Sequence, residues 1–135
     1  MEPTVGDESG FIFVDKPRDF PGRAAIVVRL PHGIRSKKKL FAVFADKLRF
    51  PGYFGWNWDA FEECLGDLSW LPAGQSVAIV HEDLPFGPGG VNRGIYLNVL
   101  QDLFNHWSAQ GGRIVQVILP ASFQHGINPS ANEPR

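Results

Sequence analysis

The chain has 135 residues, of which 44% are hydrophobic and 13% aromatic, and a formal net charge of −1. This length and composition predict one compact domain, while the single cysteine, Cys64, excludes an intrachain disulfide and is interpreted as a core residue. No apolar run reaches the length of about 20 residues that spans a bilayer, and the N-terminus lacks a basic region followed by an apolar one, so we expect a soluble, cytoplasmic protein.

Residues 1–23 are interpreted as an N-terminal extension, residues 24–120 as the folded domain and residues 121–135 as a C-terminal tail. The first ten residues are polar and acidic, which predicts disorder. Residues 11–14 fit either a short strand or an apolar flap, and the extension is left without an assigned structure. The tail is rich in Pro, Asn and Ser, so we expect it to be mobile.

Three apolar segments are typical of strands buried in a parallel sheet, namely residues 24–30, 76–81 and 114–119. Three helices are predicted between them, covering residues 37–48, 58–68 and 92–110, with Ser36 and Asn57 as N-caps of the first two. The order is strand, helix, helix, strand, helix, strand. It predicts an α/β fold in which a small three-stranded parallel sheet with right-handed connections is packed with helices.

The most informative stretch runs from Phe50 to Leu71. Pro51 and Gly52 end one helix, and Asn57 starts the next. On a helical wheel the apolar residues of this second helix fill one arc. The opposite arc contains Asp59, Glu62, Glu63, Gly66 and Asp67. We therefore expect the carboxylates to face outward together.

Charge is strongly segregated along this part of the chain. No lysine or arginine occurs between Arg49 and Arg93, whereas that interval contains six acidic residues. An ordinary exposed helix face mixes charges of both signs, because ion pairs four residues apart each stabilise it by about 0.2 to 0.5 kcal/mol. A purely acidic face attracts a cationic partner and repels nucleic acid.

Two other charged clusters have functional and structural interpretations. Lys37, Lys38 and Lys39 fall in the first turn of a predicted helix, where cations oppose the dipole. Nucleic-acid contact is one reading, but a solvated basic patch is favoured because no aromatic residues accompany the lysines. The segment from His81 to Asp83 contains metal-ligand residue types, yet adjacent residues of an extended chain point to opposite sides. We predict no metal and no cofactor.

An enzyme is the alternative from another class, with Asp59 and Glu62 or Glu63 as an acid/base pair. Carboxylates on one exposed helix face lack the enclosing cleft that such chemistry needs. A protein without catalytic activity is therefore predicted.

The segment from Pro51 to Leu65, PGYFGWNWDAFEECL, matches the pattern P-x-Y-(Y/F)-G-x-N-x-D-A-hydrophobic-x-(D/E)-C-L. On this motif the chain resembles the barstar family of ribonuclease inhibitors, and the resemblance extends over residues 24–119. It implies a protein, monomeric when free, that binds a ribonuclease in the cytoplasm and covers its active site with the acidic helix and the preceding loop. An immunity or interaction module for a different basic protein is the alternative.

The resemblance also implies the binding residues. Tyr53, Asn57, Asp59 and Glu63 match contact positions of the family, and Glu63 stands where an aspartate is common. The predicted partner-binding residues are Tyr53, Phe54, Gly55, Asn57, Asp59, Glu62, Glu63, Gly66 and Asp67. Our hypothesis ranks Glu63 and Asp59 as charged anchors, Tyr53 as the aromatic anchor and Asp67 as a rim charge.

Overall fold

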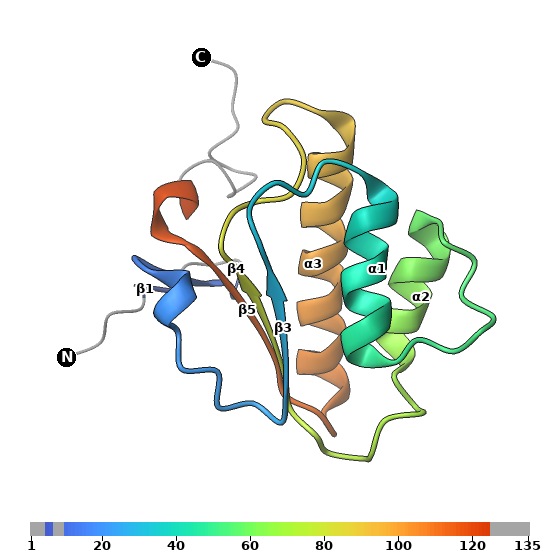
Figure 1. Cartoon of the computed structure of the whole chain (residues 1–135). Coiled ribbons are helices and arrows are strands. Elements are labelled where there is room, and N and C mark those ends of the chain that lie inside the picture. Colours follow the sequence, from blue (N-terminus) through green and yellow to red (C-terminus); the bar gives the residue numbers. More distant parts are fainter. Residues whose placement is uncertain (1–4, 7–9, 125–135) are drawn as a thin grey trace.

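The computed structural model describes residues 5–6 and 10–124 (Figure 1). One sheet is covered on one face by the helices and on the other by the N-terminal segment. The strands are β1 (Val5–Gly6), β2 (Ile12–Val14), β3 (Ile26–Leu30), β4 (Val77–His81) and β5 (Val115–Pro120). The helices are α1 (Lys37–Leu48), α2 (Trp58–Asp67) and α3 (Val91–Gln110), and short 3-10 turns cover Pro17–Asp19 and Ala121–Phe123.

The strand order is β1-β2-β5-β4-β3, with β1 antiparallel to β2 and all the other neighbours parallel. The parallel α/β architecture is confirmed, but the predicted three-stranded sheet is wrong, because β2 adds a fourth parallel strand beside β5. In the register of this pair Phe13 lies opposite Leu119. Residues 11–14, which fit either a short strand or an apolar flap, thus include a strand at Ile12–Val14, and three residues are too few for their alternation alone to decide between the two.

The N-terminal segment contributes to both faces of the sheet. Phe11 and Phe13 are buried in the core beneath the helices, whereas Val14 belongs to a second cluster on the opposite face. Phe20 packs against this second cluster, and its carbonyl accepts a 2.7 Å hydrogen bond from the guanidinium of Arg29.

Both predicted N-caps are confirmed. The Ser36 hydroxyl accepts a 3.1 Å hydrogen bond from the Lys39 amide, and the Asn57 side-chain oxygen accepts one of 2.8 Å from the Ala60 amide. α1 and α2 each end at a residue in the left-handed conformation, Arg49 and Leu68. The helices therefore begin where the side chains supply the first acceptor.

Both ends of the chain extend past the described residues. The expected disorder of residues 1–10 and the expected mobility of the tail fall mainly on residues 1–4, 7–9 and 125–135, which lie outside the described part. Within that part, Val5–Gly6 pair with β2, and Ala121–Phe123 continue from β5 as a 3-10 turn.

Candidate partner-binding surface

The acidic arc of α2 faces solvent, as predicted. α2 is the outermost helix and lies against α1 and α3 rather than on the sheet (Figure 1). Its apolar arc is buried, through Phe61, Cys64 and Leu65. The four exposed carboxylates are Asp59, Glu62, Glu63 and Asp67. The one-sided distribution read from the sequence is therefore an outward-facing acidic surface.

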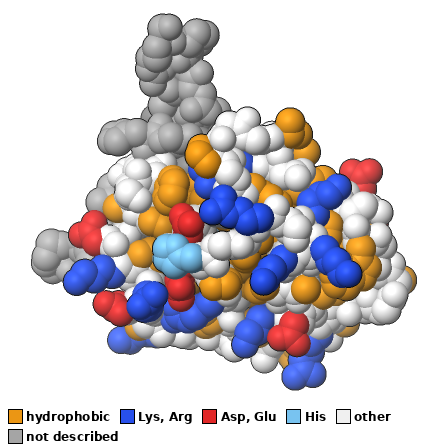
Figure 2. Space-filling model, turned by 45° about the horizontal axis from the view of Figure 1, so that its top comes forward, with side chains coloured by type: hydrophobic (Ala, Val, Ile, Leu, Met, Phe, Trp, Pro, Cys, Tyr) orange, Lys and Arg blue, Asp and Glu red, His pale blue; other side chains and the backbone are white. Residues whose placement is uncertain are grey.

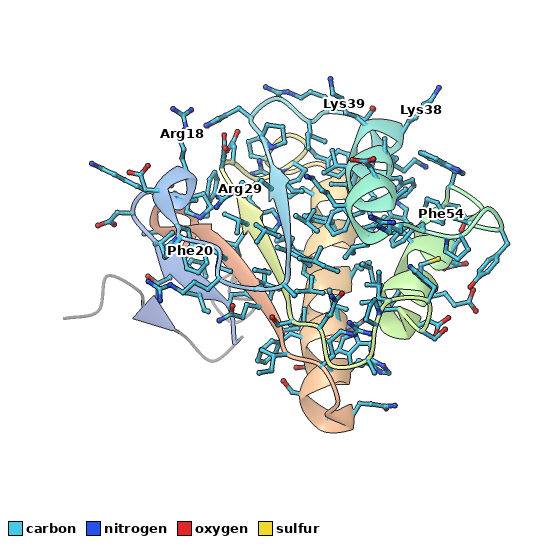
Figure 3. All side chains as sticks on the ribbon, turned by 60° about the horizontal axis from the view of Figure 1, so that its bottom comes forward. Arg18, Phe20, Arg29, Lys38, Lys39 and Phe54 are labelled. Carbon is cyan, nitrogen blue, oxygen red and sulfur yellow. The ribbon has the colours of Figure 1, made fainter. Side chains whose placement is uncertain are left out.

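No cation within the described residues neutralises this surface. The ion pair found in that part of the chain joins His32 to Asp83, with 3.5 Å between Nδ1 and Oδ2, and does not involve α2. Figure 2 shows lysine and arginine side chains spread over another face of the molecule. The exposed Lys38 and Lys39 of α1 extend away from the ribbon in Figure 3. No ion pair within the described residues therefore offsets the charge of the acidic surface.

Tyr53 is the more exposed of the two large exposed aromatic residues in the loop before α2, with 72% of its surface accessible. Desolvation raises the pKa of its phenol, and the negative charge of Asp67 adds to this. The phenol is therefore within electrostatic reach of Asp67 and Glu63 on the acidic arc. An exposed tyrosine next to carboxylates offers both an apolar ring and a hydroxyl to a partner.

Phe54 is buried, although its place in the motif predicts a partner-binding residue. Only 6% of its surface is exposed, and its ring packs edge-on against Phe41 and Phe50 with centroid distances of 5.7 and 4.9 Å. Phe54, labelled in Figure 3, supports the loop from within and has little surface left for a partner. Trp56 instead is 49% exposed, and sequence reasoning did not include it. The sequence did contain one signal for the exposure of Trp56, namely its position in the loop, outside the apolar arc of the helix.

Gly55 and Asn57 shape the entry into α2. The Asn57 side-chain nitrogen donates a 3.3 Å hydrogen bond to the Gly55 carbonyl while its oxygen caps the helix. A Cβ at Gly55 would lie 3.2 Å from that nitrogen, which is closer than ordinary packing allows. These two predicted site residues therefore hold the loop in position for its exposed neighbours.

A groove of about 110 Å³ separates α2 from α3 at the edge of the acidic surface. Glu62 and Gly66 border it from α2, and Asp102 and His106 from α3. Desolvation raises the pKa of Glu62, and Asp102 raises it further, because protonated Glu62 can donate a hydrogen bond to the Asp102 carboxylate. Asp102 thus joins the acidic surface from a distant part of the sequence, which local reasoning could not show.

Hydrogen bonds near both ends of α2 connect it to α3. The Trp58 indole nitrogen donates to the Asn92 side-chain oxygen at 3.3 Å, and the Trp107 indole nitrogen donates to the Leu65 carbonyl at 3.0 Å. Arg113, buried over the Trp107 ring, donates to the Leu68 carbonyl at 3.1 Å. The Leu65 and Leu68 carbonyls at the end of α2 thus each receive a donor from outside the helix. The same bonds hold the acidic surface in a fixed orientation.

The segment from His81 to Asp83 does not form a metal site. The His81 ring is buried, with Nδ1 2.9 Å from the Ile118 carbonyl and Nε2 2.6 Å from the Tyr96 hydroxyl, so both nitrogens are occupied. Throughout the described residues, no three His, Cys, Asp or Glu side chains are arranged to hold a metal ion. The same part of the chain contains no helix with the length and apolarity to span a membrane.

A family model described as Barstar (barnase inhibitor) matches residues 25–119. The chain belongs to the barstar family. The resemblance seen in the loop and acidic helix is thereby confirmed over most of the chain, and the family so described is one of inhibitors rather than enzymes. Searches of curated proteins and of solved structures found no match. In this barstar-family protein α2 and its loop lie within the matched range, whereas β2 lies before it.

Proposed function

We propose that this barstar-family protein inhibits a ribonuclease by covering its cationic active site with α2 and the loop before it. The observation that carries the proposal is the row of exposed carboxylates on α2, which has no counterion in the described part of the chain and is fastened at both ends. The proposal includes action in the cytoplasm and a monomeric free state.

The chemistry supports a ribonuclease as the partner. A ribonuclease must hold the phosphates of its substrate with cationic groups, and carboxylates placed where phosphates bind accept the same charge-assisted hydrogen bonds. Opposite charges also speed encounter and make association sensitive to salt. A rigid helix loses little conformational entropy on binding, so more of the interaction energy contributes to affinity.

Individual residues have different expected roles. Glu63 and Asp59 are the charged anchors, and the exposed ring of Tyr53 is the aromatic anchor at the side of Asp67. Asp67 acts mainly on the rate of association. Gly66 borders the groove beside α2, where a Cβ would come into ordinary van der Waals contact with the His106 ring at 3.9 Å.

The test is inhibition of purified barnase and of a panel of other basic microbial ribonucleases, at low and moderate salt. We expect one-to-one inhibition of at least one enzyme, weakened by salt, and a loss of about tenfold or more for Glu63→Ala and for Asp59→Ala. Asp46→Ala is the matched control, since it removes an exposed carboxylate from α1 and leaves α2 intact.

Failure to inhibit any enzyme of the panel, or inhibition that is unchanged in both α2 variants, would contradict the proposal. Tight binding of a basic protein without ribonuclease activity would favour the alternative, an immunity or interaction module. The salt dependence separates charge-led recognition from apolar contact in either case.

A further inference from the structure

Trp56 has a backbone conformation that a residue with a side chain rarely adopts. Its φ is +57°, in the left-handed region that favours glycine and asparagine. It lies between Gly55 and the helix cap Asn57 and leaves 49% of its surface exposed. A large aromatic residue at such a position contributes less to folding than it would in the core.

The indole of Trp56 also differs from the other three in its hydrogen bonding. Trp58, Trp70 and Trp107 each donate the indole N–H to an acceptor of the protein, at 3.3, 2.7 and 3.0 Å. Within the described residues, the N–H of Trp56 has no such acceptor. The Trp56 ring packs against the Phe54 ring, with a centroid distance of 5.2 Å and an interplanar angle of 38°. The buried ring of Phe54 therefore supports one side of an indole whose remaining surface is accessible.

The surroundings of Trp56 indicate the chemistry of its ligand. The loop places Trp56 at the N-terminal end of α2, close in sequence to the exposed Asp59, and places Tyr53 near Asp67 farther along the helix. A cation is attracted to the face of an indole, and nearby carboxylates increase the attraction. Arginine suits this environment better than lysine, because its planar guanidinium stacks on the ring and still donates several hydrogen bonds in its plane.

We propose that Trp56 is a further partner-binding residue, which stacks on an arginine of the basic partner and selects arginine over lysine at that place. This inference rests on the proposed function, since it concerns the same surface. It identifies the kind of side chain that the partner presents. The aromatic part of the surface then consists of Tyr53 and Trp56, with Phe54 as their support.

The test uses two peptides of equal charge, hexa-arginine and hexa-lysine, titrated into the full chain at low salt by calorimetry and NMR. We expect the wild-type protein to bind hexa-arginine about threefold or more tightly than hexa-lysine. Trp56→Asn removes the indole and tolerates the left-handed backbone, so it should abolish the preference without lowering the melting temperature. Ile114→Ala, which alters another exposed apolar residue, should leave the preference unchanged.

Equal affinities for the two peptides in the wild type, or an undiminished preference in Trp56→Asn, would overturn the inference, as would the absence of saturable binding of either peptide. The peptides are not ribonucleases, so the result is independent of the inhibition assay. If Trp56→Asn loses the preference for hexa-arginine but the wild-type protein inhibits no ribonuclease, only the proposed function is contradicted. If the wild-type protein inhibits a ribonuclease but Trp56→Asn keeps the full preference for hexa-arginine, only the role of Trp56 is contradicted.

Discussion

The Tyr96 hydroxyl donates a buried hydrogen bond to the His81 ring, with 2.6 Å between the phenol oxygen and Nε2. The direction follows from the other ring nitrogen. Nδ1 lies 2.9 Å from the Ile118 carbonyl, which only accepts, so in the neutral ring Nδ1 carries the proton and Nε2 accepts. This chain of bonds connects α3, β4 and β5 at the centre of the molecule.

We expect His81 to make stability depend on pH. Burial lowers its pKa to about 4, below the ordinary value of 6.5. Between these values the unfolded chain binds a proton that the native protein does not, so the stabilisation is complete above pH 6.5 and is lost as the pH falls toward 4. The loss is about 3 kcal/mol. Urea unfolding across this range should show it.

His81→Gln and His32→Gln are the matched variants for this measurement, because His32 is exposed and His81 is fully buried. His81→Gln should remove the part of the pH dependence that comes from the buried imidazole. His32→Gln should leave that part nearly unchanged. If wild type and His81→Gln lose stability in parallel between pH 6.5 and 4, the buried imidazole is not the cause.

Tyr96→Phe should destabilise the protein by about 1 to 3 kcal/mol. The ring still packs in the core, but the His81 Nε2 is left as a buried acceptor without a donor. Chemical denaturation measures the effect. Tyr53→Phe removes the same hydroxyl group from an exposed residue and should change the free energy of unfolding by well under 1 kcal/mol. Similar losses in the two variants would argue against the buried bond.

Asn57→Ala should cost about 1 kcal/mol of stability, because the Ala60 amide loses its acceptor at the start of α2. Asn57→Asp keeps an acceptor and adds a charge that the helix dipole favours, so it should retain most of the stability. The free energy of unfolding of both variants tests this. An equal loss in both would show that the cap contributes little.

Asp102→Ala should lower the pKa of Glu62. Desolvation is the largest cause of the elevation and persists in the variant, but the hydrogen bond and the charge of Asp102 are removed. The pKa of Glu62 should therefore move toward its ordinary value without reaching it. NMR titration of the carboxyl carbons measures the shift, and Asp46→Ala on α1 serves as a control. An unchanged Glu62 pKa in Asp102→Ala would show that the two carboxyls do not interact.

Local signals predicted much of the fold and of the site. Ser36 and Asn57 are followed by apolar residues at helical spacing, and the structure starts both helices there. The outward direction of the carboxylates follows from the same periodicity, because the arc opposite Phe61 and Leu65 has to face solvent. Such features depend on residues within a few turns of one another.

The remaining features depend on contacts between distant segments. The place of β2 in the sheet depends on its pairing with β5, about a hundred residues later. Asp102 reaches Glu62 because α3 packs beside α2. Phe54 is buried because it packs against Phe41 of α1 and Phe50, a contact that its place in the motif does not reveal.

The place of β2 in the sheet matters for any shortened version of this protein. A fragment starting at residue 25, where the match to the family model begins, would lack β2 and two buried phenylalanines, Phe11 just before the strand and Phe13 within it. β5 would then become a border strand with open hydrogen-bonding groups, and such borders join with those of other molecules. We expect the fragment to self-associate and precipitate even though the residues that face the partner are all present in it.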